Sequence, residues 1–389
     1  MPRLLTILSF AVPALAALYG MHRYAWKRIV RDTGLARPWR IAATSALLGL
    51  GLVLPLAFAL RRLPPGDWTG VSFMAYGWLG FLFYLVLALA VLDLARWAAG
   101  RRRPTVEVDL DRRRLLARTV AGSALAVSGL VGIAGVRRAW EITTPEIEVR
   151  LPRLPRQLAG FRIAQLSDLH LGPLLSEPFL EDVVARTNAL RPDLVVITGD
   201  LVDALVDGFG DRLAPLSKLR SRCGTAFVTG NHEYYFGAEE WVGFLRSRGI
   251  LVLQNERIAI GDEDPGGASF DLAGIPDHHG GRFVESHAPD LDRALAGRDP
   301  GRELVLLAHQ PRQLAMAKGK GVGLQLSGHT HGGQLWPFGL LVGIFQPWIA
   351  GFHRAEDGTL LYVSRGTGFW GPPMRVANPA EIATIVLTA

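Results

Sequence analysis

The hexapeptide Gly328-His329-Thr330-His331-Gly332-Gly333 sets two imidazoles two residues apart within a frame of glycines. Imidazoles at that spacing have little structural use, and the glycines let the chain turn sharply and approach other groups closely. Shorter motifs precede it in the same half of the chain: Asp168-Leu169-His170, Gly199-Asp200, Gly230-Asn231-His232-Glu233 and the single His309. Together they supply carboxylates, imidazoles and one amide, the ligand types that hold two divalent ions side by side.

Nearly all of these residues directly follow an apolar run that predicts a β-strand. Strands are predicted at 161–166, 193–198, 224–229, 250–253, 269–274, 303–308, 323–327, 360–364 and 381–387, and helices near 177–190, 211–221, 238–248, 288–296 and 312–318. The early alternation predicts βαβ units, and the strand-rich later part predicts a second sheet, so we expect an α/β sandwich. Because ligands gather outside the carboxyl ends of strands in such sheets, Asp168 and His331 are expected to meet.

Long apolar runs precede residue 140, at 4–20, 41–60, 71–92 and 119–136. Each comes close to the roughly 20 residues that a helix needs to cross a bilayer. We therefore predict a transmembrane domain of about four helices over 1–140, a linker with an entry strand over 141–157, and a second domain over 158–389. For the run 4–20, a cleavable signal peptide is the alternative, because Ala14-Leu15-Ala16 fits the outline of a cleavage site.

The two parts of the chain differ in charge. Residues 1–156 hold 22 Lys/Arg and 9 Asp/Glu, whereas residues 157–389 hold 20 and 26. The net charge of +7 therefore belongs to the membrane part, and no nucleic-acid partner is expected. Cys223 is the only cysteine, which excludes an intrachain disulfide and argues against thiolate ligation of a metal.

Basic residues in the connections between the apolar runs predict the orientation. The connection 21–40 carries six Lys/Arg, 61–70 carries two (Arg61 and Arg62), and 93–118 carries eight, including Arg101–Arg103. The positive-inside rule places the first and third connections in the cytoplasm. Arg112-Arg113-Arg114-Leu115-Leu116 is also similar to a twin-arginine export signal. We therefore expect a multi-pass protein of the bacterial inner membrane with its second domain on the extracytoplasmic side.

This set of motifs resembles the calcineurin-like metallophosphoesterase superfamily over residues 158–389, and within it the membrane-anchored bacterial phosphohydrolases. The resemblance implies a four-layer-type α/β sandwich, here preceded by four transmembrane α-helices. It implies two divalent ions, the general acid at His232 and a bridging role for Asp200. One ion would be held by Asp168, His170, Asp200 and His331, and the other by Asp200, Asn231, His309 and His329.

The chemistry of such a site is coherent from the residues alone. Two ions about 3.5–4 Å apart can clamp a phosphoryl group and lower the pKa of a bridging water toward neutrality. The expected reaction is therefore hydrolysis of a phosphate mono- or diester by a metal-bridging hydroxide. Nitrogen and oxygen ligands favour Mn, Fe or Zn. Arg365 would either pair with a substrate phosphate or position its own loop, and His278 would be either a substrate contact or a surface histidine.

Residues 335–352 follow the hexapeptide almost directly and contain no charged side chain. This segment would either meet lipid or pack on the core of its own domain. We therefore expect a substrate linked to a lipid or to an envelope precursor, with the membrane as a partner. One alternative is pyrophosphate hydrolysis of the UDP-diacylglucosamine type in lipid A assembly, which the predicted orientation opposes. Another is a catalytically silent membrane scaffold, which the complete ligand set opposes.

Overall fold

The computed structural model describes residues 2–60, 68–100, 110–261 and 267–389. The chain divides into two compact units, which are Met1–Arg137 with Gly371–Met374, and Arg138–Trp370 with Arg375–Ala389. Arg61, Arg62 and Arg101–Arg103, which carry part of the orientation prediction, lie outside the described residues.

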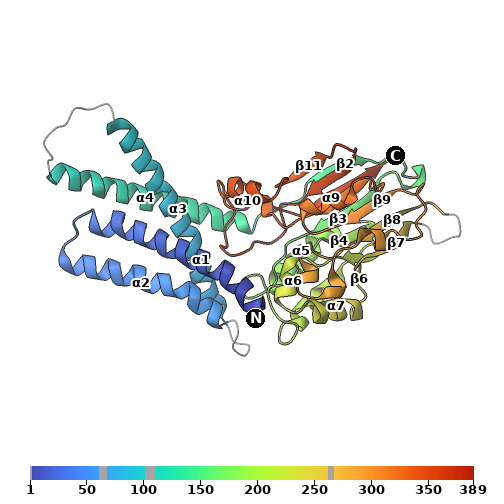
Figure 1. Cartoon of the computed structure of the whole chain (residues 1–389), viewed down its shortest axis with the longest axis horizontal. Helices are drawn as coiled ribbons and strands as arrows, with labels where there is room; N and C mark the ends of the chain where they lie inside the picture. The colour runs from blue at the N-terminus through green and yellow to red at the C-terminus, as the bar shows by residue number, and fades with distance from the viewer. Residues whose placement is uncertain (1, 61–67, 101–109, 262–266) are drawn as a thin grey trace. The chain divides into compact units, whose positions relative to one another are not determined.

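Long helices make up the first unit (Figure 1). They are α1 (Pro2–Trp26), α2 (Arg37–Leu60), α3 (Thr69–Gly100) and α4 (Leu110–Ala139), with the short π-helix η1 (Lys27–Arg31) after α1. Within the described residues, three helices are long and apolar enough to cross a membrane, namely Arg37–Ala57, Thr69–Ala99 and Leu110–Ala139. Three of the four expected crossings are thus supported, and a crossing by the run 4–20, which lies in α1, stays a prediction.

The connection expected at 21–40 is largely helical, because α1 continues to Trp26 and η1 follows it. Arg28 gives a physical reason: its guanidinium pairs with Asp32 at 2.7 Å and also with Asp93 of α3. The hydroxyl of Tyr24 donates to the same Asp93 carboxylate at 2.7 Å. These paired polar groups allow helical packing to extend past the end of the apolar run.

Two mixed six-stranded sheets form the centre of the second unit, within its described residues. The first sheet has the order β2 (Glu146–Arg150), β14 (Ala383–Thr388), β3 (Phe161–Leu166), β4 (Leu194–Ile197), β5 (Thr225–Phe227), β6 (Leu251–Val252). The second has the order β11 (Gly351–Arg354), β12 (Leu360–Val363), β10 (Leu324–Ser327), β9 (Leu304–Leu307), β8 (Ser269–Gly274), β7 (Glu256–Gly261). A small ladder pairs β1 (Ile142–Thr143) with β13 (Ala380–Glu381).

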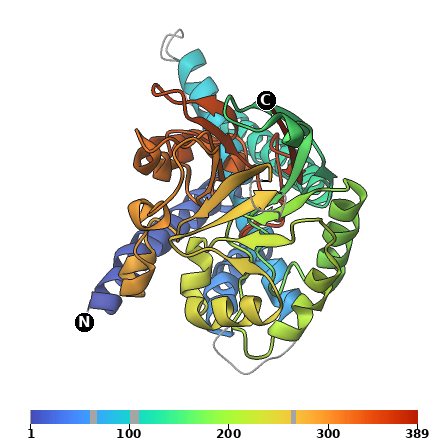
Figure 2. The same ribbon diagram turned by 90° about the vertical axis from the view of Figure 1, so that its right-hand side faces the viewer.

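Three apolar cores stack these sheets and helices into layers. One core lies between the two sheets and joins residues such as Ile163 and Val196 to Leu272 and Leu326. A second core packs α5 (Glu177–Ala189) and α7 (Ala238–Ser247) on the outer face of the first sheet (Figures 1 and 2). The third packs α8 (Leu291–Ala294) and α9 (Leu314–Ala317) on the second sheet. The expected α/β sandwich is confirmed, and each layer is apolar because both faces of the central strands are covered.

Several elements differ from the prediction. The entry strand predicted within 141–157 is β2, which pairs with β14, and the same stretch also holds β1, which pairs with β13 in the second unit. The helix predicted at 211–221 is the 3-10 helix η3 (Gly210–Lys218), since Pro215 cannot donate an α-helical hydrogen bond. The helices predicted at 288–296 and 312–318 contain only the short α8 and α9. The strands β7 and β11 and the helix α10 (Gly339–Phe345) were not predicted.

Candidate metal centre

The predicted ligands lie in turns that follow the carboxyl ends of parallel strands. β3, β4 and β5 are parallel neighbours in the first sheet, and β9 and β10 are parallel neighbours in the second. These turns carry, in chain order, Asp168 and His170 after β3, Asp200 after β4, Asn231 after β5, His309 after β9, and His329 and His331 after β10. The two sheets therefore deliver all seven side chains to one edge of the sandwich.

Five of these seven residues have a left-handed backbone. Their φ values are 53° at Asp168, 48° at His170, 51° at Asp200, 72° at His329 and 52° at His331. Each such residue costs about 1–3 kcal/mol relative to an ordinary conformation, so the surrounding structure must hold it in place. Strain concentrated in one set of turns is typical of a functional site.

Gly230 and Gly328 allow these turns to approach one another. A Cβ atom on Gly230 would lie 2.2 Å from Oδ1 of Asp200, and one on Gly328 would lie 1.9 Å from Oγ of Ser167. Both distances are far below van der Waals contact, so any side chain here would displace a neighbouring turn. The glycines that precede Asn231 and His329 are thus required by packing at the site.

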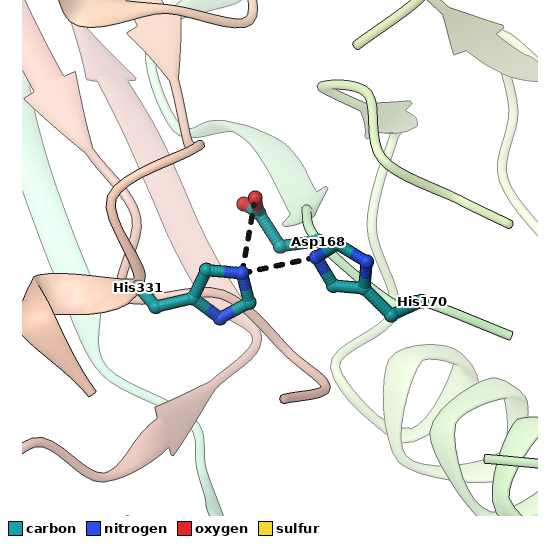
Figure 3. A group of neighbouring side chains, drawn as sticks. All are labelled: Asp168, His170 and His331. Atoms are coloured by element: carbon teal, nitrogen blue, oxygen red, sulfur yellow. Dashed lines mark hydrogen bonds and ion pairs between the residues drawn. The ribbon is translucent and has the colours of Figure 1, made fainter. Parts of the chain in front are cut away.

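Asp168, His170 and His331 form the first cluster of candidate ligands (Figure 3). Nε2 of His331 lies 3.0 Å from Nε2 of His170 and 3.6 Å from Oδ1 of Asp168. Asp168 is fully buried and accepts hydrogen bonds from Oγ of Ser167 at 2.6 Å and from the backbone N–H of His329 at 3.0 Å. These bonds fix the carboxylate so that it faces the two imidazoles.

Asp200, His309 and His329 form the second cluster. Nε2 of His309 lies 3.2 Å from Oδ2 of Asp200 and 3.2 Å from Nδ1 of His329. Nδ1 of His309 lies 2.7 Å from the backbone carbonyl of Thr198, to which it donates. That bond leaves the Nε2 atom of His309 facing the cluster, which is the arrangement common among metal-binding histidines. Although burial opposes its charge, the adjacent Asp200 carboxylate raises the pKa of His309 above its usual range.

Asp200 connects the two clusters. Its Oδ2 atom lies 3.2 Å from Nε2 of His309 and 3.9 Å from Nε2 of His170, and its Oδ1 atom accepts the backbone N–H of His232 at 2.8 Å. The neighbouring Asn231 carries a buried Oδ1 atom that no hydrogen-bond donor reaches within the described residues. A buried, unpaired amide oxygen in a turn packed against Asp200 adds a donor of the type that hard or borderline divalent ions take.

The imidazoles of the hexapeptide are in the form that binds metal ions. Burial, followed by the neighbouring His309, lowers the pKa of His329 to about 3. Burial and then His170 place the pKa of His331 well below its usual range. Burial opposes ionisation of Asp200, but the imidazoles of His309 and His232 outweigh it and lower the pKa of that carboxyl strongly. At neutral pH His329 and His331 are therefore neutral imidazoles, and Asp200 is an ionised carboxylate.

Asp203 is a site residue that the sequence did not reveal. Its Oδ1 atom lies 2.5 Å from Nδ1 of His232 and 3.1 Å from Nδ1 of His170. Although burial opposes the charge on His232, Asp203 and Asp200 outweigh it and raise the pKa of His232 to about 9. One carboxylate thus orients both a candidate ligand and the candidate general acid. The available signal was its place three residues after Asp200, in the same strand-end turn.

Glu233, the last residue of the motif Gly230-Asn231-His232-Glu233, has a structural role that the sequence did not predict. Its fully buried carboxylate accepts the backbone N–H groups of Gly230 at 2.6 Å, Asp200 at 3.0 Å and Leu201 at 2.7 Å. It therefore binds the turn after β4 to the turn after β5. Burial raises the pKa of Glu233 to about 7, against these hydrogen bonds.

The two candidate substrate contacts, His278 and Arg365, belong to neither cluster of candidate ligands. His278 is exposed and its ring contacts His279, whereas His279 lies 3.4 Å from the Gln310 side chain next to His309. Nη1 of Arg365 donates to Oε2 of the buried Glu381 at 2.9 Å, and its backbone N–H donates to Oε1. These contacts hold the loop of Arg365 to Glu381, and pairing of Arg365 with a substrate phosphate stays a prediction.

One family profile and several curated proteins match this chain. The profile of the calcineurin-like phosphoesterases matches residues 161–333. A transmembrane protein with metallophosphoesterase domain from Danio rerio is 34% identical over 379 residues, which cover 94% of this chain and 85% of that protein. The protein of the same description from Bos taurus is 36% identical over 332 residues, 82% of this chain and 74% of that one. An uncharacterized metallophosphoesterase from Campylobacter jejuni is 32% identical over 387 residues, 98% of each chain.

Proposed function

This chain belongs to the calcineurin-like metallophosphoesterase family and is a phosphoester hydrolase, and we propose that the strand-end turns cleave a phosphate mono- or diester. The observation that carries the proposal is the position of Asp200. Its carboxylate joins two clusters of buried imidazoles and carboxylates. Asn231, whose buried Oδ1 has no hydrogen-bond donor among the described residues, lies between Gly230 and His232, which both contact that carboxylate through their backbone.

From the nitrogen and oxygen donors at these turns, we infer that the site binds two divalent ions of the Mn, Fe or Zn type. The first would be held by Asp168, His170, Asp200 and His331, and the second by Asp200, Asn231, His309 and His329. When bound, such ions supply Lewis acidity toward phosphoryl oxygens and lower the pKa of water. The protein contributes a rigid set of ligands, since Asp168 and His309 are each fixed by hydrogen bonds to the turns.

His232 is the residue that we assign as general acid. Its backbone N–H is held by Asp200 and its Nδ1 by Asp203, so Nε2 is left to donate a proton to the leaving oxygen. A raised pKa keeps the imidazole protonated at neutral pH, as this role requires. His170, Asp200 and His232 also lie close enough to share an ion. The contact of His232 with Asp203 favours the proton-donating role over ligation.

The surroundings of His232 favour an apolar leaving group. The rings of Tyr235 and Trp370 contact its imidazole edge-on at centroid distances of 5.2 and 5.8 Å, and Phe283 contacts Tyr235. All three aromatic side chains are exposed. Exposed aromatic rings beside a proton donor suit a leaving group with apolar character. We therefore propose that the substrate is a lipid-linked or envelope-related phosphate ester.

The catalytic unit is assigned to the extracytoplasmic face of a bacterial inner membrane. The basic connections around 21–40 and 93–118 lie inside by the positive-inside rule, so α2, α3 and α4 lead the chain outward after residue 139. This result does not depend on whether α1 crosses, because α1 changes only the side of the amino terminus. A reporter that is active only outside the cytoplasm, fused after Ala389, tests the assignment, and an inactive fusion that is nevertheless expressed overturns it.

The decisive assay uses the purified full chain in detergent, loaded with Mn, Fe or Zn. We expect turnover of bis(p-nitrophenyl) phosphate or p-nitrophenyl phosphate, and faster turnover of phosphate esters on lipids in a substrate panel. Two bound ions with no hydrolysis of any ester would overturn the enzymatic assignment in favour of a silent scaffold. Preference for a nucleotide-linked pyrophosphate would instead support the UDP-diacylglucosamine type of reaction.

A further inference from the structure

Helix α10 (Gly339–Phe345) has the sequence Gly-Leu-Leu-Val-Gly-Ile-Phe, and none of its seven residues is buried. Leu340, Ile344 and Phe345 are each at least 70% exposed. Just before the helix, Trp336 and Phe338 are exposed as well. In water, an apolar patch of this kind is unfavourable by about 25 cal/mol for each Å² left uncovered. The sequence allowed this segment either to meet lipid or to pack on the core of its own domain. Its central part, helix α10, does not pack on that core.

The ends of α10 are nevertheless held firmly on the catalytic turns. A Cβ atom on Gly333 would lie 2.4 Å from the Cα atom of Gly339, so the helix begins directly against the turn of His331. Oγ1 of Thr330, within the same hexapeptide, donates to the carbonyl of Ile349 at 2.5 Å. Arg312 donates to the carbonyl of Phe345 at 3.1 Å and so caps the last turn. These contacts fix the position of α10 relative to the turn of His331, with its apolar side chains exposed.

The same edge of the second unit receives the chain from the membrane helices. The candidate span in α4 ends at Ala139, and β1 begins at Ile142, so two residues join them. The ring of Trp140 contacts Phe369 at 5.7 Å. The next residue, Trp370, exchanges two hydrogen bonds of 3.0 Å with the side chain of Gln334, the residue before Leu335.

This short series of contacts lies wholly within the second unit, and it places the point of attachment close to the segment that leads into α10. The three Cα–Cα steps from Ala139 to Ile142 span at most about 11 Å. The end of a membrane-spanning helix and the exposed apolar helix therefore belong to one edge of the unit. Because the candidate span in α4 is connected to this edge, the bilayer is the apolar medium available to cover α10.

We propose that α10, together with Trp336 and Phe338, is a membrane-contacting surface that enters the headgroup region of the bilayer in which the chain is anchored. Apolar residues without charge, flanked by aromatic side chains, are the composition that binds at a lipid interface. Because α10 rests on the turn of His331, this contact would hold the metal centre at the lipid surface. The inference deepens the proposed function, since it specifies how a lipid-linked ester reaches the site.

A spin-label experiment on the full chain in lipid nanodiscs tests the proposal without relying on catalysis. Cys223 is replaced by Ser, and a single cysteine is placed at Ile344 or, as a control, at Leu251, which is exposed at the amino end of β6. We expect the label at 344 to be accessible to oxygen and protected from a water-soluble nickel complex, at a depth of about 5–10 Å. The label at 251 should show the reverse. Free access of the nickel complex to position 344 would overturn the proposal.

Two further readouts exclude other occupants and unfolding. Spin–spin broadening at 344 that disappears on dilution with unlabelled chain would show a second copy on this face, and would also overturn the proposal. Hydrolysis of bis(p-nitrophenyl) phosphate by each labelled variant should equal that of the Cys223→Ser chain, because α10 contributes no ligand. If that hydrolysis is absent in all chains while 344 is still protected, the proposed reaction is wrong and the membrane contact stands.

Discussion

The membrane helices expose apolar side chains, whereas the metal centre buries polar ones. Leu52 of α2 and Leu130 of α4 are 69% and 70% exposed, whereas Asp168 and His309 are fully buried. In water, both arrangements are unfavourable, because apolar surface is left exposed in one and polar groups are desolvated in the other. Each therefore indicates a component outside the polypeptide: lipid around the helices and cations between the carboxylates and imidazoles. Helix α10 belongs to the first kind although it lies in the second unit.

The largest expected effect comes from removing the charge that the two clusters share. We predict that Asp200→Asn lowers the turnover of bis(p-nitrophenyl) phosphate about a thousandfold or more, since several kcal/mol of transition-state stabilisation depend on the ions. Initial rates with saturating Mn provide the measurement. The matched control is Asp211→Asn, which alters a fully exposed carboxylate and should leave the rate unchanged. A fully active Asp200→Asn chain would show that the buried carboxylate shared by the two clusters is not needed for catalysis.

Removal of the ions should abolish activity and also destabilise the second unit. With free metal at about a hundred times its Kd, each bound ion contributes about 2.7 kcal/mol to the free energy of unfolding. A chelator should therefore lower the Tm, and added Mn should restore both Tm and activity. In Asp200→Asn the chelator should lower the Tm much less. Equal Tm values for the wild-type chain with and without chelator would show that the buried charges need no ions.

Replacing His232 separates proton donation from ligation. We predict that His232→Ala slows hydrolysis of an alkyl phosphate ester by about a hundredfold, the usual contribution of a general acid. Esters of p-nitrophenol should be much less affected, because that leaving group needs no proton. Metal analysis should still find two ions per chain. The loss of one ion would instead place His232 among the ligands, with His170 and Asp200.

A smaller effect is expected from Asp203, which touches histidines and no candidate ion site directly. Loss of an orienting carboxylate around a metal site costs about 10- to 100-fold in affinity or activity. We predict a fall of this size in kcat for Asp203→Asn, with a rise in the Mn concentration needed for half-maximal rate. Asp207→Asn, in the same loop and exposed, is the control. If both variants kept the wild-type rate, the contacts of Asp203 with His170 and His232 would have no functional weight.

The smallest expected effect is a pH dependence of stability in the metal-free protein. The pKa of His232 rises on folding from 6.5 to about 9, so its pairing with Asp203 stabilises fully below pH 6.5 and is lost as the pH rises toward 9. The pKa of Asp203 is lowered from 3.8, so its contribution is lost as the pH falls below that value. Urea unfolding of wild type and Asp203→Asn should differ by about 1–3 kcal/mol near pH 5.5 and converge near pH 9. A difference that is constant with pH would contradict the pairing.

Local patterns were sufficient for much of the fold and for the candidate ligands. The apolar run before Asp168 and the run before Asp200 are strands because their β-branched and aliphatic residues are covered on both faces. Since parallel strands align their carboxyl ends, residues far apart in the chain could be expected at one edge. The same reasoning failed for 211–221, where Pro215 interrupts the helical hydrogen bonds, and for the very short α8 and α9.

Contacts between distant turns could not be predicted in this way. Asp203 orients His170 and His232, and Glu233 joins two turns, but neither pairing leaves a period or a spacing in the sequence. Arg375 is similar, since its buried guanidinium contacts the carbonyls of Gly366 and Gly368 beside His331. The sequence also did not predict which apolar residues of 335–352 are buried. In the structure Leu335 is buried, whereas Leu340 is exposed.

The order of residues along the chain therefore determined the candidate ligands, most of the strands that precede them and the candidate membrane spans, because these depend on composition and on short-range periodicity. The packing of the two sheets established the partners of each imidazole, the left-handed turns that aim them and the outward face of α10. Those features depend on groups that are far apart in the chain, and their free energies arise only when the sheets bring them within hydrogen-bond distance.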